Sequence, residues 1–572
     1  MDDSVNFRSL DPSWITERIA ELGGQLLASF PVVGGVVTVS DREGTLAETS
    51  FGYANRESAT PASANFAYEI GSISKVLAGL VVARLVTEGR LALDEVVSNV
   101  LPRISGAVVR SDATVRDLCN HTAGAIVGSD TLPDDAGEIW YARDARATYV
   151  SPARFHYSNL GYQLLGEVVR SRTGRSLVDL EREWILEPLN MRHARARITH
   201  DDRARMAVGY WPARTDQPWV PGAPLCPAPW FESDSASGNA LATSSDMVLL
   251  AAEILRAAGG ELRGAHSATV ITPQAYELAT TTLAPQGEPF ATHDGLLTVG
   301  ESRYGLGVNV ATIDGLFCLT HGGGMVGYST FLIVDCTSGV AVSVLTSANG
   351  DCLGAQLLAR AVHGEIVRRR RNTSSPSGVD LRCAVVVGRS GELPFSEECV
   401  GRFTSDRDHT ELHVTHEGAG SPVTVSTGGR AGGLYRLPSG RFVTDHPQFR
   451  RFLLDCPSGT GGWIYGGTRY ARDAPGPPLG ESSNPLVGRY RSFSPWYPEF
   501  RVVERDAKLW LAAPGGTEAP DGDEELVELS PGLYRVGAAD WLPERLVVGS
   551  IVNGRAVALV RDGCPYSRAT GE

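Results

Sequence analysis

Apolar residues predict the first elements of the chain by their spacing. Residues 31–53 favour a β-hairpin, since valines fill the stretch before the turn Asp41-Arg42-Glu43-Gly44 and aromatic residues follow it. From Ser72 onward, apolar residues recur every three or four positions, and Gly89 ends the pattern. This spacing predicts a helix that buries one face. Residues 110–250 are mostly helical and loop-like in character.

Strand character returns after residue 300, and a predicted helix follows these strands. The predicted strands are residues 308–310, 316–320, 331–334 and 340–345. The predicted helix covers residues 353–367 and leads into the basic run Arg368 to Arg371, which suits the negative end of a helix dipole. The order of strand, helices, strand and helix predicts an α+β domain, with a mainly antiparallel sheet flanked by helices.

The composition changes after this domain. Residues 372–378 are rich in Ser, Pro and Gly, and short strands with Gly and Pro turns come next. We therefore expect a catalytic domain at 1–371, a linker at 372–394, a β domain at 395–473, a second linker at 474–484 and a β domain at 485–572.

A weak internal repeat links the two β domains. Gly401-Arg402-Phe403 matches Gly488-Arg489-Tyr490, and Gly433-Leu434-Tyr435-Arg436 matches Gly532-Leu533-Tyr534-Arg535. Tyr470-Ala471-Arg472 resembles Tyr566-Ser567-Arg568. Closure removes exposed strand edges, so each unit is expected to form a small antiparallel barrel.

Charge and cysteine usage narrow the function. The 572 residues carry a formal net charge of -14, which disfavours nucleic acid or an anionic membrane as a partner. The N-terminus lacks the pattern of a signal peptide, and no stretch is apolar for long enough to cross a bilayer. Nine cysteines lie singly, which predicts a reducing, cytoplasmic setting without disulfides or a zinc site. We expect no metal and no cofactor.

The first chemical motif is Ser72-Ile73-Ser74-Lys75, at a strand-to-helix junction. Positions i and i+3 share one face of a helix, so the Ser72 hydroxyl and the Lys75 amine are expected to meet. A serine next to a basic group is the arrangement that a nucleophile requires.

Two later motifs strengthen this interpretation. In Tyr157-Ser158-Asn159, a tyrosine near a lysine can accept a proton, and the asparagine can orient the lysine and bind a substrate carbonyl. In the run from His321 to Gly324, glycines allow a substrate backbone to approach the strand edge and leave N–H groups free for an oxyanion.

In this order, the three motifs resemble the serine β-lactamase and penicillin-binding-protein superfamily, in particular its class C branch with D-aminopeptidases, esterases and penicillin-binding-protein-type thioesterases. The phrases at 120–124, 164–166 and 236–243 are also similar to family phrases. The resemblance covers about residues 15 to 370. The terminal domains are similar, more loosely, to the lipocalin-like barrels of D-aminopeptidases.

The resemblance implies acyl transfer through an ester on Ser72. Lys75 and Tyr157 would share the role of general base, and which of them first takes the serine proton stays open. Asn159 would orient Lys75, and His321 would donate a hydrogen bond towards the Tyr157 oxygen or a substrate carboxylate. The oxyanion hole would combine the N–H of Ser72 with one from Gly323 or Gly324, of which Gly324 is preferred by motif position.

The function expected is hydrolysis of an amide, peptide or ester bond in a small molecule. An alternative is an acyltransferase or thioesterase that forms an amide or ester in natural-product biosynthesis. A catalytically silent binding module is a further alternative, although every motif residue is present. The sequence leaves open the substrate, its stereochemistry, the role of the β domains and whether the protein forms a homo-oligomer.

Overall fold

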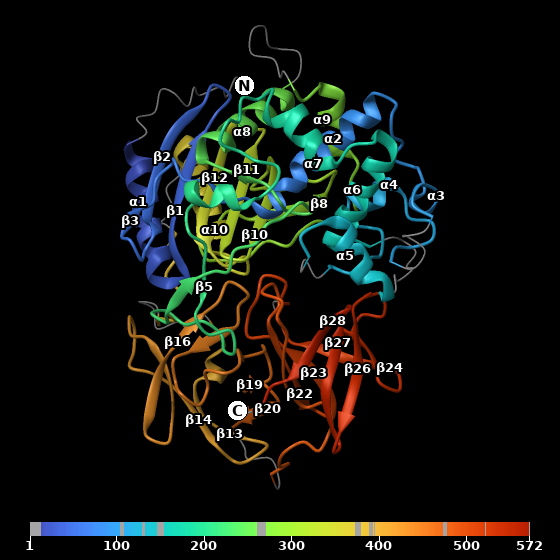
Figure 1. The fold of residues 1–572 in the computed structure, drawn as a ribbon. Coiled ribbons are helices and arrows are strands. Elements are labelled where there is room, and N and C mark those ends of the chain that lie inside the picture. Colours follow the sequence, from blue (N-terminus) through green and yellow to red (C-terminus); the bar gives the residue numbers. More distant parts are fainter. Residues whose placement is uncertain are drawn as a thin grey trace. The chain divides into compact units, whose positions relative to one another are not determined.

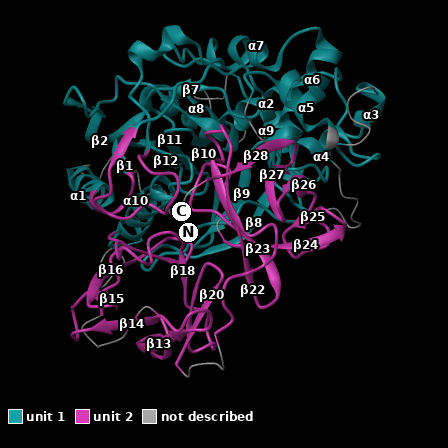
Figure 2. Ribbon diagram, turned by 60° about the horizontal axis from the view of Figure 1, so that its bottom comes forward, with its two compact units in different colours: residues 1–27, 32–211, 227–381 teal, residues 28–31, 212–226, 382–572 magenta. Residues whose placement is uncertain are grey.

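The structure is a computed structural model. It describes residues 13–102, 108–128, 132–145, 154–259, 270–371, 379–387, 393, 395–472, 478–520 and 522–570. The chain divides into two compact units (Figure 2). The first comprises residues 1–27, 32–211 and 227–381, and the second comprises residues 28–31, 212–226 and 382–572.

An eight-stranded sheet forms the centre of the first unit, with the strand order β3-β2-β1-β12-β11-β10-β9-β8. Its strands are β1 (Val32–Ser40), β2 (Thr45–Asn55), β3 (Thr60–Pro61), β8 (Val299–Tyr304), β9 (Asn309–Ile313), β10 (Leu316–Met325), β11 (Tyr328–Asp335) and β12 (Val340–Ala348). All neighbouring pairs are antiparallel. The predicted hairpin and the four later strands are confirmed.

The α-helices lie between residues 13 and 370, among the strands of this sheet along the chain (Figure 1). They are α1 (Ser13–Ser29), α2 (Ser74–Thr87), α3 (Val97–Val100), α4 (Val115–Cys119), α5 (Asp135–Tyr141), α6 (Asn159–Thr173), α7 (Leu177–Glu181), α8 (Ser244–Ala258), α9 (Pro273–Thr281) and α10 (Gly354–Arg370). α8 and α10 both contact the central strands, and every residue of β1, β11 and β12 is buried. Successive strand residues point to opposite faces, so both faces of the sheet centre are covered. The predicted α+β domain is confirmed.

Two glycines allow α2 to approach the turn after β8. A Cβ atom on Gly79 would overlap the Leu306 carbonyl, and one on Gly307 would overlap the carbonyl of Lys75. Gly307 also has φ +74°, a conformation that side chains disfavour. This close packing brings the end of β8, with Tyr304, next to the helix that carries Lys75.

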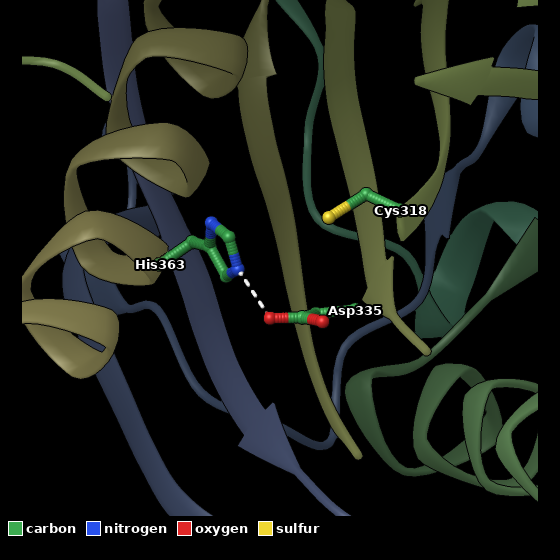
Figure 3. A group of neighbouring side chains, drawn as sticks. All are labelled: Cys318, Asp335 and His363. Atoms are coloured by element: carbon green, nitrogen blue, oxygen red, sulfur yellow. Dashed lines mark hydrogen bonds and ion pairs between the residues drawn. The ribbon is translucent and has the colours of Figure 1, made fainter. Parts of the chain in front are cut away.

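A buried side-chain pair joins α10 to the sheet (Figure 3). His363 of α10 lies 3.0 Å from a carboxylate oxygen of Asp335, at the end of β11. Burial raises the pKa of Asp335, but hydrogen bonds from His363 and Ser338 and the charge of His363 outweigh it and lower the pKa overall. The pair satisfies polar groups that burial would otherwise leave unpaired.

Two closed, eight-stranded antiparallel barrels form most of the second unit, as predicted. The first contains β13 (Gly401–Ser405), β14 (Glu411–His416), β15 (Val423–Thr427), β16 (Arg430–Arg436), β17 (Phe442–Thr444), β18 (Leu454–Asp455), β19 (Trp463–Tyr465) and β20 (Thr468–Ala471). The second contains β21 (Gly488–Arg491), β22 (Glu499–Arg505), β23 (Lys508–Ala512), β24 (Glu524–Ser530), β25 (Leu533–Val536), β26 (Arg545–Val552), β27 (Arg555–Arg561) and β28 (Cys564–Arg568).

The repeat corresponds to one feature that both barrels share. In the first barrel, the Arg472 guanidinium lies 5.1 Å from the ring centre of Phe403. In the second, Arg568 lies 5.0 Å from the ring centre of Tyr490. The aromatic residue comes from the first strand and the arginine follows or ends the last, so this cation–π contact helps to close each barrel.

The first barrel differs from expectation in two respects. Cys399 and Cys456 form a disulfide, so the prediction of unpaired cysteines is wrong for this pair. Disulfides persist in oxidising environments, and the pairing therefore removes the cysteine argument for a reducing compartment. Residues 383–387 fall in the predicted linker, yet they bond to the barrel strands and bring Val385 and Val387 into the core. Residues 372–378 of that linker and 473–477 at the second lie outside the described residues.

Residues 212–226 belong to the second unit, although they lie within the predicted catalytic domain. Asp216 pairs with Arg214 at 2.7 Å, and its backbone carbonyl accepts a hydrogen bond from Arg501 of the second barrel. The hydrogen bond and charge of Arg214 lower the pKa of Asp216 to about 2, with a further contribution from Arg489. Arginines of the second barrel thus hold residues 212–226.

In the described part of the chain, no helix is both long and apolar enough for a membrane crossing.

Candidate active site

Ser72 and Lys75 lie at the start of α2. Ser72 is in a single 3₁₀ turn, η2 (Gly71–Ile73), and α2 begins at Ser74. The predicted helix therefore starts two residues later than expected. Ser72 is partly exposed and Lys75 is fully buried, and the Lys75 Nζ lies 3.0 Å from the Ser72 Oγ. The structure brings the alcohol and the amine together in hydrogen-bonding geometry.

Two further acceptors hold the Lys75 amine. Asn159 Oδ1 accepts a hydrogen bond from Nζ at 2.7 Å, and the backbone carbonyl of Ser237 accepts another. Ser237 lies in the segment 236–243, one of the phrases noted in the sequence. An ammonium has three donors, and Ser72, Asn159 and Ser237 supply three acceptors.

The second motif comes directly before α6 because Ser158 caps that helix. The Ser158 hydroxyl accepts a hydrogen bond from the Gly161 N–H at 2.9 Å and donates one to the Ile126 carbonyl at 2.6 Å. An N-cap has extended backbone while the next residue is helical. Tyr157 and Asn159, on either side of the cap, therefore both face Lys75: the Lys75 Nζ lies 5.0 Å from the ring centre of Tyr157.

His321 lies inside β10, which continues through Met325 instead of ending before the motif. Its Nδ1 pairs with the Gly322 carbonyl at 2.7 Å, so this nitrogen carries the proton. Its Nε2 therefore accepts a hydrogen bond from the Tyr304 hydroxyl, at 2.6 Å. Burial lowers the pKa of His321 to about 3, with a smaller contribution from the Lys75 charge. His321 is neutral, and its Nε2 pairs with Tyr304, whereas the sequence predicted a bond to Tyr157 or substrate.

The glycines of the third motif lie against the Ser72 turn. β10 pairs with β9 only as far as Thr320, so residues 321–325 have a strand partner on the β11 side alone in the described sheet. A Cβ atom on Gly323 would overlap the carbonyl of Ile70. The same carbonyl accepts a hydrogen bond of 3.0 Å from Thr330 of β11. The missing side chain at Gly323 thus sets the distance between β10 and the nucleophile turn.

Sequence reasoning missed Tyr304 and Glu288. Tyr304 is buried, and its position beside two glycines at a strand end is the only signal that pointed to it. Glu288 is partly exposed, and among the described residues its carboxylate has no hydrogen-bond or ion-pair partner. Burial raises the pKa of Glu288 to about 7, although the charge of Lys75 lowers it.

Cys318, Asp335 and His363 are the described residues whose arrangement comes nearest to a metal site (Figure 3). One potential ligand atom from each lies within 4.8 Å of the others, and all three residues are buried. Structural zinc takes four ligands, and these residues supply three, two of which already pair with each other. We interpret the group as the packing contact between α10 and the sheet.

A family model described as Beta-lactamase matches residues 23–363. The match covers more than half of the 572 residues. This chain therefore belongs to the beta-lactamase family.

Curated relatives match part of the catalytic domain. The chain is 28% identical over 218 residues to penicillin-binding protein 4 of Amycolatopsis lactamdurans, which covers 36% of this chain and 56% of that protein. This chain is also 29% identical over 171 residues to protein flp of Staphylococcus aureus strain MW2. That alignment covers 28% of this chain and 34% of protein flp. The matches span about half and about a third of these relatives.

Solved structures share the fold. The octameric penicillin-binding protein homologue from Pyrococcus abyssi aligns with a TM-score of 0.52 and 20% identity, covering 81% of this chain and 100% of that one. The D-amino acid amidase from Ochrobactrum anthropi SV3, complexed with L-phenylalanine amide, aligns with a TM-score of 0.50 and 19% identity. The alignment covers 63% of this chain and 99% of the amidase chain.

Proposed function

We propose that this protein is a serine acyl-enzyme hydrolase that cleaves an amide, peptide or ester bond of a small molecule. The observation that carries the proposal is the placement of Lys75. Its Nζ lies 3.0 Å from the Ser72 Oγ while Asn159 and Ser237 fix it from other sides. A buried cation next to a partly exposed serine serves nucleophile activation better than it serves stability, since burying a charge is costly.

Tyr157 takes the serine proton in this proposal. The three acceptors around the Lys75 Nζ suit its ammonium form, which leaves the amine no lone pair to accept a proton. A cation beside a phenol favours the phenolate. The Ser72 oxygen attacks the substrate carbonyl carbon and its proton passes to the Tyr157 oxygen. Tyr157 then gives this proton to the leaving nitrogen or oxygen as the bond to the acyl carbon breaks.

The oxyanion of the tetrahedral intermediate is held by backbone N–H groups. The Ser72 N–H, in a 3₁₀ turn, and the Gly324 N–H, on the part of β10 without a β9 partner, are the groups that we assign. Removing one such donor typically slows a reaction by about 10²–10³-fold.

Water completes the cycle. It attacks the ester carbonyl and gives one proton to Tyr157, and the bond to the Ser72 oxygen breaks. The proton then returns from Tyr157 to the Ser72 oxygen, which restores the resting enzyme. The Tyr304–His321 pair is neutral and takes no proton in any of these reaction steps. We therefore assign it to shaping the substrate side of β10.

Labelling of Ser72 tests the proposal. The full-length protein is incubated with a fluorophosphonate or a β-lactam, and its intact mass is measured. We expect one adduct on wild type and none on Ser72→Ala. The same protein is then given amino acid p-nitroanilides and p-nitrophenyl esters, with and without primary amines.

The products decide between the alternatives. Free acid as the main product supports hydrolysis, whereas an amide of the added amine shows acyl transfer. No label on wild type, under conditions that label a control serine hydrolase, would overturn the proposal in favour of a silent binding module.

A further inference from the structure

We propose that His121 is a positioning residue that fixes the ring of Tyr157 beside Lys75. The inference rests on the proposed function, in which Tyr157 carries the proton. It adds a role for His121, which lies in the loop after α4 and within the sequence phrase at 120–124.

His121 accepts hydrogen bonds from both chain neighbours of Tyr157. The His121 carbonyl accepts a bond from the His156 N–H at 2.8 Å. The His121 Nδ1 accepts one from the Ser158 N–H at 3.0 Å. The backbone on either side of Tyr157 is therefore tied to a single residue.

The imidazole also contacts the Tyr157 ring directly. The two ring centres are 4.3 Å apart at an angle of 33°, within the range of attractive ring contacts. His121 also contacts Tyr304 and Tyr162, whose ring centres lie 4.6 and 5.1 Å from its own. The ring contact and the two backbone hydrogen bonds therefore couple the position of Tyr157 to that of His121.

Two unfavourable features of His121 support a functional role. Its backbone has φ +60°, in the left-handed region that few residues other than glycine adopt. Its Nε2 is buried without a hydrogen-bond partner among the described residues. Each feature destabilises the fold, and such strain persists where the surroundings impose it, often at active sites.

His121 stays neutral and acts by shape, not by proton transfer. Burial lowers its pKa well below the usual value, and the charge of Lys75 lowers it further. Since Nδ1 accepts a hydrogen bond, the proton is on Nε2. The other titratable groups around the pair are Lys75, His156, Tyr162, Glu288, Tyr304 and His321.

The experiment compares His121→Ala, His121→Asn and Tyr157→Phe in the full-length protein. Asparagine tolerates the left-handed region, and its Oδ1 can replace Nδ1 as the acceptor for Ser158, but it has no ring. The readouts are the melting temperature, the rate of Ser72 labelling by a fluorophosphonate and the pH dependence of that rate. His409→Ala is the matched control, because His409 also has φ +60° but lies in an exposed loop of the first barrel.

We expect His121→Ala to slow labelling about 100-fold, the loss typical of a misplaced catalytic group. His121→Asn should recover the melting temperature but remain about tenfold slow. In both, the acid limb of the pH profile should move to higher pH, because a displaced phenol gains less from the Lys75 cation.

Full recovery of both rate and pH profile in His121→Asn would overturn the inference and leave His121 a backbone support. This comparison stands even if His121→Ala does not fold. A wild-type protein that takes no label refutes the proposed function instead, so the two failures are distinguishable. His409→Ala should keep the wild-type rate.

Discussion

The carboxylate of Asp135 accepts a hydrogen bond of 2.8 Å from the hydroxyl of Ser235. Asp135 also accepts the Ala236 N–H at 3.0 Å, and the Ser235 oxygen lies 2.9 Å from the Ser237 hydroxyl. The Ser237 carbonyl in turn holds the Lys75 amine. A buried acid on α5 thus supports the segment that fixes the catalytic lysine.

Asp135→Ala should slow Ser72 labelling about tenfold and lower the stability by about 2 kcal/mol, because it leaves two buried donors unpaired. Burial raises the pKa of Asp135 well above its usual value, which favours the uncharged acid. Asp135→Asn should therefore stay within about twofold of the wild-type rate, since it keeps the acceptor without a charge change.

Asp134→Ala is the control for this prediction. Asp134 is exposed and caps α5 through the Gly137 N–H at 2.8 Å. Its loss should cost about 1 kcal/mol of stability with no change in labelling. Equal effects of both alanine variants on the labelling rate would contradict a specific role for Asp135.

Gly323→Ala should abolish most activity. The added Cβ would overlap the Ile70 carbonyl, so the Ser72 turn would have to move away from β10. A shift of this kind misaligns the nucleophile with the oxyanion donors, and labelling should fall about 100-fold or more. At Gly322, the nearest atom to an added Cβ is 3.5 Å away, in the ring of Phe331. Gly322→Ala should therefore label at nearly the wild-type rate.

The fold was predictable where the local spacing of apolar residues also determines which face of an element is buried. The valines of β1 predicted a buried strand, and the hydrophobic spacing after Ser72 predicted α2. The motifs predicted that Ser72, Lys75 and Asn159 meet, and in the structure Lys75 donates hydrogen bonds to Ser72 and Asn159. These features rest on residues close in sequence or on a resemblance that includes their arrangement.

The remaining features depend on contacts that no local pattern encodes. Cys399 and Cys456 are 57 residues apart, and only closure of the first barrel brings them together. Tyr304 meets His321 because β9 pairs with both β8 and β10, with Asn309 opposite Tyr304 on one side and Thr320 on the other. The sequence predicted His321 as a site residue but could not show that its Nε2 would pair with Tyr304.

Glu69 should make stability fall as pH rises. It lies on β4 (Tyr68–Glu69), which pairs with β7 (Leu241–Ala242), and burial raises its pKa to about 8 from 4.5. Between these values the folded protein keeps a proton that the unfolded chain has lost, so the unfolding free energy declines across this window and levels off above it. Glu69→Gln should remove a decline of a few kcal/mol, about 1.4 for each pKa unit.

Chemical denaturation at pH 5, 7 and 9 measures this effect. Glu17→Gln, on the exposed face of α1, is the control and should leave the pH dependence unchanged. Wild-type and Glu69→Gln curves that stay parallel from pH 5 to 9 would refute the assignment.

Tyr304→Phe should slow acylation, whereas Tyr328→Phe, with a similar loss of stability, should not. The change removes the hydroxyl that donates to the His321 Nε2 at 2.6 Å and leaves that nitrogen buried and unpaired. His321 then keeps its Nδ1 bond to the Gly322 carbonyl but loses the bond that fixes Nε2. We expect labelling to slow about tenfold. Tyr328→Phe provides the comparison, because the Tyr328 hydroxyl is also buried and donates to a carbonyl, that of Ala207, at 2.7 Å. Each variant loses one buried hydrogen bond and should lose about 1 kcal/mol of stability. Since Tyr304, unlike Tyr328, bonds to His321, a rate loss in both variants, or in neither, would show that the Tyr304–His321 bond has no specific part in acylation.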